Sequence, residues 1–206
     1  MDANLRPEGR NGALVRTIES YRRYWQEWAQ AWEFQALLKA RACAGDDELG
    51  RAFEEAAHPY VWSAAKREGF VEAARAMRRR VEDNISRSHA SRELKLGRGG
   101  LRDVEFTVQL LQLVHGRTDA FLRVPSTLDA IDALSEGGYI ARSDAADLAS
   151  CYRFLRAVEH RTQLPRMRRT HLIPDKDAEL RVLGRAMGAR RFPDAASMSA
   201  AIDEVR

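Results

Sequence analysis

The spacing of apolar residues predicts helices along almost the whole chain. Between about residues 17 and 39, large apolar side chains recur in steps of three and four, which is the period of one helix face. They are Ile18, Tyr21, Trp25, Trp28 and Trp32. We expect Thr17 to cap this long helix and its tryptophans to pack in the core rather than to stack on nucleic-acid bases.

Further segments with a helical period cover about residues 47–58, 70–85, 101–115, 127–135, 143–164, 175–187 and 194–206. We expect Pro59 to end the first of them, because proline interrupts a helix, and Ser143 to cap the longest. Strand patterns are nearly absent, and nothing repeats at a fixed period. The sequence therefore predicts an all-α fold, a multi-helix array of mostly antiparallel helices.

The first fifteen residues follow no helical period. Pro7, Gly9 and Gly12 lie within eight residues of Leu5, a composition typical of a loop. Because a chain that starts in such a loop looks truncated, we expect residues 1–15 to be a remnant of another domain. Residues 16–190 are then the helical domain, in which a subdivision near 88–100 stays open, and 191–206 begin a further helix or linker.

The composition is that of a folded globular protein. Of 206 residues, 45% are hydrophobic and 31% are charged, which excludes a disordered chain. No apolar run approaches the roughly 20 residues of a membrane span, and the N-terminus lacks the pattern of a secretory signal. Cys43 and Cys151 are far apart, so we expect reduced thiols in a cytoplasmic protein.

Positive charge gathers in two segments. Residues 75–102 hold nine Lys and Arg against three acidic residues, and residues 153–171 hold six Arg against Glu159 alone. Such segments indicate a site for phosphate or nucleic acid. Helices with solvated arginine faces would look the same.

A polar stripe interrupts the otherwise apolar helix expected over 101–115. Glu105, Gln109 and Gln112 follow at i, i+4 and i+7, and a buried carboxylate is costly unless it is paired. The helix over 143–164 offers a polar face, so we expect the two stripes to meet or to share a cleft. Arg156 or Arg161 should then pair with Glu105. A buried ion pair that only fixes the register of two helices is the alternative, and both can hold together.

Two basic loops are candidates for phosphate binding. Gly97–Gly100 precedes a helix start, where free backbone amides attract anions, and Lys95 and Arg98 lie beside it. It is not a nucleotide-binding fingerprint, because no strand precedes it. The second candidate is the run from Arg161 to His171. No pair of histidines has the spacing of a zinc site.

Several stretches resemble the glutamine-synthetase adenylyltransferase family. They are Asp2–Gly12, Trp32–Arg41 and Lys95–Phe106, the last followed by Gln109–Leu113. Tyr152–Arg161 resembles a second motif, which PII uridylyltransferases share in looser form. The resemblance extends from residue 2 to about residue 188, and the combination is specific.

The resemblance implies an enzyme with two polymerase-β-like nucleotidyltransferase domains, each followed by a helical domain. One copy attaches AMP to a glutamine-synthetase tyrosine, and the other removes it by phosphorolysis. Both need a Gly-Ser loop, an Asp-x-Asp pair and a third carboxylate that together hold Mg²⁺. By position, Asp2 resembles that third, catalytic and metal-binding carboxylate, after a loop or strand remnant of the catalytic domain.

The sequence has neither a Gly-Ser loop nor an Asp-x-Asp pair. We therefore expect the isolated chain to be inactive and to bind no Mg²⁺ tightly. The remaining candidates form a phosphate, nucleotide or inter-helix polar site. They are Lys39, Arg41, Lys95, Arg98, Glu105, Gln109, Arg156, Glu159 and Arg161.

The expected function is that of the helical domain of this enzyme. The stretches 99–106 and 169–174 look more like the adenylyl-removing copy. The resemblance implies glutamine synthetase, the PII signal protein, and ATP, ADP or phosphate as partners, and no membrane. One alternative is a module that docks glutamine synthetase or PII without chemistry. A nucleic-acid-binding helical protein, suggested by the pI of about 9.3, fits less well because the distinctive motif carries a buried acid.

Overall fold

The computed structural model describes residues 6–206, except for the side chain of Arg166. The predicted all-α array is confirmed. The helices are α1 (Ile18–Glu27), α2 (Ala31–Leu37), α3 (Asp47–Ser63), α4 (Phe70–Asp83), α5 (Leu101–His115), α6 (Thr127–Glu136), α7 (Arg142–Gln163), α8 (Asp177–Gly188) and α9 (Ala195–Val205). Short 3-10 turns are η1 (Gly9–Asn11), η2 (Ala64–Lys66), η3 (Ala120–Leu122) and η4 (Leu164–Arg166).

Within residues 6–206 there is no strand, and extended backbone pairs at one isolated bridge, between Glu93 and Leu172. No helix of this part of the chain combines the length and the apolar character that crossing a membrane requires. Residues 6–15, expected to carry a loop, form turns and η1.

The chain forms two compact units. Unit 1 comprises the residues up to Ala76 together with Gln109–Ser126, and unit 2 comprises Met77–Val108 and Thr127–Arg206. Both α4 and α5 therefore pass from one unit into the other. The domain boundaries expected from the sequence stay predictions.

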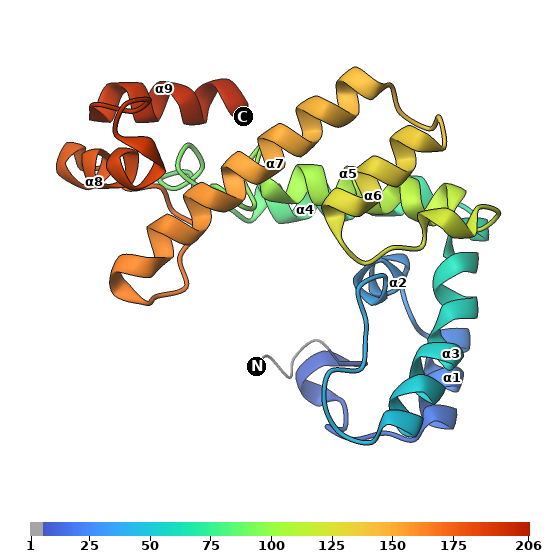
Figure 1. The fold of residues 1–206 in the computed structure, drawn as a ribbon. Helices are drawn as coiled ribbons and strands as arrows, with labels where there is room; N and C mark the ends of the chain where they lie inside the picture. Colours follow the sequence, from blue (N-terminus) through green and yellow to red (C-terminus); the bar gives the residue numbers. More distant parts are fainter. Residues whose placement is uncertain (1–5) are drawn as a thin grey trace. The chain divides into compact units, whose positions relative to one another are not determined.

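Unit 1 is built around aromatic packing between α1 and α3, which lie side by side in Figure 1. Trp25 of α1 meets Phe53 of α3 edge to face, with ring centroids 5.6 Å apart. Phe34 of α2 is fully buried in the same core. The guanidinium of Arg67 lies 4.6 Å from the centre of the Phe34 ring and donates to the carbonyl oxygens of Trp25 and Ala29.

The prediction of one long helix over 17–39 was wrong. Thr17 caps α1 as expected, accepting from the Ser20 amide, but the helix ends at Glu27 and α2 starts at Ala31. The Glu33 carboxylate causes the break, because it accepts the Gln30 amide in a capping box that starts a new helix. Trp28 and Trp32 consequently leave the core and are 68% and 42% exposed.

Two further helix limits differ from the prediction. Pro59 lies inside α3, which continues to Ser63. An interior proline costs about 3 kcal/mol, and the burial of Val61 and Trp62 beyond it offsets that cost. Ser143 is not the cap of α7, because the helix already starts at Arg142, and its N-cap residue Ala141 provides no side-chain hydrogen bond.

Unit 2 packs α6 against α7, α7 against α8, and α8 against α9; Figure 1 shows the last pair side by side. Its core is aliphatic, with Leu101, Ile131, Leu134, Leu155 and Met198 fully buried. As predicted, α9 starts after Asp194, whose carboxylate accepts the Ser197 amide at 2.8 Å. Helix α7 contacts α6, α8 and α9, and it carries several of the polar residues of the candidate site.

Replacing Leu134 by alanine should destabilise unit 2 by about 2–5 kcal/mol, because the side chain is fully buried and a cavity replaces it. Urea unfolding followed by circular dichroism measures the change. Val182→Ala, at a side chain that is 49% exposed, is the control and should stay within about 0.5 kcal/mol of the native chain. An unchanged midpoint for Leu134→Ala would contradict this packing.

Candidate functional site

A buried carboxylate on α5 is held by two arginines. Glu105 is 5% exposed. Arg156 of α7 donates through Nη2 to Glu105 Oε1 at 2.6 Å, and Arg102 donates through Nη1 to Oε2 at 3.1 Å. Of the two predicted partners of Glu105, Arg156 and Arg161, it is Arg156 that forms the pair. Because each carboxylate oxygen has a cationic donor, the cost of desolvating Glu105 is offset.

Arg156 is the centre of this arrangement. Besides Glu105, it donates through Nη1 to Glu159 Oε2 at 2.6 Å and through Nε to the Tyr152 hydroxyl at 3.1 Å. All three guanidinium nitrogens are therefore engaged. Burial alone would lower the pKa of Arg156, but the hydrogen bonds to Tyr152 and Glu159 and the charge of Glu105 raise it. The arginine is a fixed positive charge between two acids.

Glu159 is the second buried acid, at 3% exposure. Its Oε1 lies 2.9 Å from His171 Nδ1, an ion-pair distance without hydrogen-bond geometry. Burial would raise the pKa of Glu159, yet the hydrogen bond and charge of Arg156, with smaller contributions from Lys95 and His171, hold it below its ordinary value. Glu159 is therefore ionised at neutral pH.

The backbone brings these groups together in three ways. Tyr152, Arg156 and Glu159 follow at i, i+4 and i+7 on α7, so they share one helix face. Arg102 and Glu105 are one turn apart on α5. His171 is held by an extended pairing of two loops, in which the Leu94 amide donates to the His171 carbonyl at 2.8 Å and the Ile173 amide to the Arg92 carbonyl at 2.9 Å.

The glycine loop before α5 has its amides in use. The Gly99 amide donates to Asp103 Oδ2 at 2.7 Å, and the amides of residues 100–102 donate to backbone carbonyls of residues 94–97. Asp103 in turn forms an ion pair with Arg78. The carboxylate of Asp103 thus occupies the position that a phosphate would take at this helix start.

The polar stripe on α5 divides after Glu105. Gln109 belongs to unit 1, where it accepts from Gln35 at 3.0 Å. Gln112 donates to the carbonyls of Leu122 and Val124 in the same unit. The expectation that the whole stripe faces the polar side of α7 was therefore wrong, because the amides pair with groups of unit 1.

The other candidate residues lie outside the cluster. Arg98 is highly exposed, with Glu82 at 3.5 Å. Arg161 donates to the Ala186 carbonyl at 2.6 Å instead of reaching Glu105. Lys39 and Arg41 are exposed residues of unit 1. Asp2 lies outside the described residues.

Three residues that contact these charged groups, Arg102, Tyr152 and His171, were not among the predicted site residues. Arg102 could have been found, because an arginine three residues before a buried glutamate on one helix is a typical pair. Tyr152 lies on the predicted polar face of α7 but carries no charge to mark it. No sequence signal connects His171 to Glu159, since a loop separates them.

We name the set Arg102, Glu105, Tyr152, Arg156, Glu159 and His171 the ion cluster. Both of its carboxylates are committed to cations, so neither is available as a general base or a metal ligand without breaking a pair. In the described part of the chain, no three His, Cys, Asp or Glu side chains gather as a metal site. What the ion cluster does directly is to hold α5 and α7 in one register.

Two family models match the chain. Residues 75–206, well over half of the chain, match the model described as GlnD PII-uridylyltransferase, and residues 1–56 match the model described as Glutamate-ammonia ligase adenylyltransferase. The ion cluster lies entirely in the first of these regions.

Among curated proteins, the chain is 61% identical over 193 residues to a bifunctional glutamine synthetase adenylyltransferase/adenylyl-removing enzyme from Streptomyces coelicolor, covering 94% of this chain and 19% of that protein. It is 59% identical over 194 residues to the protein of that name from Mycobacterium avium (94% and 19%) and 57% identical over 202 residues to that from Mycobacterium tuberculosis (98% and 20%). The chain belongs to the glutamine synthetase adenylyltransferase/adenylyl-removing enzyme family. Members of this family in the curated set are much longer, and the chain spans about a fifth of their length.

Replacing Arg156 by methionine should destabilise unit 2 by about 3–5 kcal/mol, because it leaves buried carboxylates without their shared cation. Arg153→Met, at an exposed position three residues earlier on α7, is the matched control and should stay within about 0.5 kcal/mol of the native chain. Urea unfolding compares the two. Equal stability of both variants would show that the ion cluster contributes nothing.

The stability of unit 2 should fall in acid more steeply for the native chain than for Glu159→Gln. Since the folded-state pKa of Glu159 lies below its ordinary value of 4.5, its stabilising contribution is complete above that pH and is lost as the pH falls through the folded pKa. Urea unfolding at a series of pH values, from neutral to below 4.5, measures the difference in the free energy of unfolding between the two proteins. A difference that does not shrink in acid would contradict the lowered pKa.

Proposed function

We propose that this chain is the helical domain of an enzyme that adds AMP to, and removes it from, a tyrosine of glutamine synthetase. The observation that carries the proposal is the ion cluster. Its members come from two of the stretches by which the sequence resembles this family, Lys95–Phe106 and Tyr152–Arg161, with His171 added by the fold. A motif that builds a buried charge network positions helices, and this supports a scaffold beside a catalytic domain.

Within that enzyme, we assign the chain to the half that removes AMP by phosphorolysis. The resemblance of residues 99–106 and 169–174 to that copy supports the assignment. The excess positive charge over 75–102 and 153–171 suits a reaction that collects inorganic phosphate. Glutamine synthetase, PII and ATP, ADP or phosphate are then the partners, and the cytoplasm is the site of action.

The reaction as proposed uses Mg²⁺ held by carboxylates of the catalytic domain. The ion cluster does not suit that ion, because the oxygens of Glu105 and Glu159 are engaged by cations, whereas Mg²⁺ binding uses free carboxylates and substrate phosphates. Asp2, the expected ligand, lies outside the described residues. No step is therefore assigned to the metal here.

A docking module without chemistry is the second candidate. Trp28 and Trp32 favour it, since both are exposed on unit 1, and large aromatic side chains are enriched in protein interfaces. Binding of the chain to adenylylated glutamine synthetase or to PII, with no dependence of the activity of the whole enzyme on the ion cluster, is the result that this candidate predicts.

In the whole enzyme that contains this chain, Arg156→Met should lower the rate of phosphate-dependent release of ADP from adenylylated glutamine synthetase at least about tenfold. This corresponds to a rise of about 1.4 kcal/mol in the activation free energy. Attachment of AMP should stay within about twofold, and the chain alone should show neither activity. Attachment is measured with ATP labelled at its α-phosphate, and removal with glutamine synthetase that carries the labelled AMP group. Arg153→Met is the control in both.

Loss of attachment with removal intact would assign the chain to the other half. If both activities survive in an enzyme whose unit 2 is folded by circular dichroism, the proposed scaffold role is wrong and the docking candidate stands. Turnover by the isolated chain would contradict the expectation that its catalytic groups lie elsewhere.

A further inference from the structure

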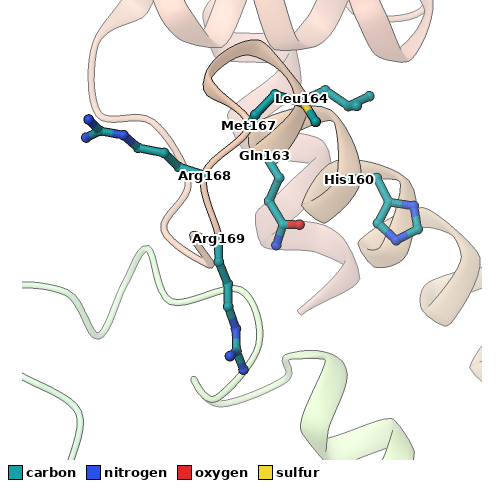
Figure 2. A pocket seen from close by; sticks show the side chains of 6 residues that line it. All are labelled: His160, Gln163, Leu164, Met167, Arg168 and Arg169. Atoms are coloured by element: carbon teal, nitrogen blue, oxygen red, sulfur yellow. The ribbon is translucent and has the colours of Figure 1, made fainter. Parts of the chain in front are cut away.

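A hollow of about 390 Å³ lies at the C-terminal end of α7, where the chain turns through η4 and runs back. Figure 2 shows its six lining residues, which are His160, Gln163, Leu164, Met167, Arg168 and Arg169. Its size falls within the range of roughly 300–1,000 Å³ that is usual for small-molecule sites. None of these residues belongs to the ion cluster.

The loop that forms this hollow is held in place. Gln163 donates through Nε2 to the Thr170 carbonyl at 2.9 Å, and the Met167 amide donates to the Leu164 carbonyl at 3.3 Å. Immediately after the loop, His171 is fixed by its backbone bond to Leu94. Met167 adopts a left-handed conformation with φ of 46°, which is uncommon for a residue with a side chain. The hollow is therefore preformed.

Its charge is positive and not neutralised. Arg168 and Arg169 are exposed and form no hydrogen bond or ion pair with any residue that the structure describes. The described lining residues include no carboxylate, and Glu159, one turn before Gln163, is already committed to Arg156. An anion is the ligand that this electrostatic environment attracts.

Of the remaining lining residues, Leu164 and Met167 are apolar, and His160 and Gln163 can form hydrogen bonds. Leu164 and Met167 are 62% and 84% exposed, so their surface is available for contact. Gln163 Oε1 has no hydrogen-bond donor among the described residues and can accept one from a ligand. In Figure 2, Gln163 and Arg169 point to the same side of the loop, while Arg168 points away from them. Arginine binds phosphate oxygens through a planar fork.

We propose that this hollow binds a nucleoside phosphate, whose base lies against Leu164, Met167 and the edges of His160 and Gln163. Its phosphates meet Arg169, and Arg168 adds positive charge from the other side of the loop. A protein partner is a poorer fit, because a standard interface covers about 800 Å² on each side and the exposed apolar surface here is limited to two side chains. The proposal rests on the proposed function for its choice of ADP as the ligand. Because it concerns binding to the chain itself, its failure would leave the tests of enzymatic activity unaffected.

Isothermal titration calorimetry of the 206-residue chain with ADP tests the proposal, with adenosine and inorganic phosphate as separate probes. ADP should bind at one site, and adenosine and phosphate should each bind at least about tenfold more weakly, since each lacks half of the contacts. The double variant Arg168→Ala with Arg169→Ala should bind ADP at least about tenfold more weakly than the native chain. Arg79→Ala with Arg80→Ala removes the same charge from exposed positions of unit 2 and should change the affinity less than about twofold.

A second variant tests the apolar wall with both arginines in place. Leu164→Asp should weaken ADP at least about tenfold, whereas Val182→Asp, an equal change at another exposed apolar residue, should not. The proposal is overturned if ADP does not bind saturably, if phosphate binds as tightly as ADP, or if the control variants lose as much affinity as their counterparts. Circular dichroism of each variant verifies that it is folded.

Discussion

The structure of unit 2 depends on one guanidinium that serves two buried acids. Arg156 lies between Glu105 and Glu159, which are 5% and 3% exposed. Each carboxylate would be costly to bury alone. A single arginine can donate to both because the nitrogens of its planar guanidinium point in different directions. Since Glu105 lies on α5 and the other two residues lie on α7, the same contact links these two helices.

The fold could be predicted wherever helical periodicity is unambiguous. The limits of α5 agree with the predicted residues 101–115, because apolar residues cover that helix nearly all round and Gly116 follows it. The predicted helix ends were wrong where a local hydrogen bond or tertiary packing competes with the periodicity. A capping box at Gln30 and Glu33 broke a continuous apolar stripe, and burial of Val61 and Trp62 carried α3 through a proline. Neither effect is visible in periodicity, since one depends on a side-chain hydrogen bond and the other on packing.

Part of the site could be predicted from chemistry alone. A buried acid on a largely apolar helix requires a cation, and this argument led to Arg156 or Arg161, of which Arg156 forms the pair. The prediction that Gln109 and Gln112 also face the polar side of α7 was wrong. Gln109 accepts from Gln35, and Gln112 donates to loop carbonyls of unit 1. The hollow around η4 and the contact of His171 with Glu159 arise from the course of a loop, which residue spacing does not encode.

The central claim is that Arg156 and Glu105 stabilise unit 2 through each other. A double-mutant cycle with Glu105→Gln and Arg156→Met, measured by urea unfolding at neutral pH, tests it most directly. We expect a coupling free energy of about 1–3 kcal/mol, with the double variant less destabilised than the sum of the single variants. A coupling below about 0.3 kcal/mol would contradict the account, because the two side chains would then act independently.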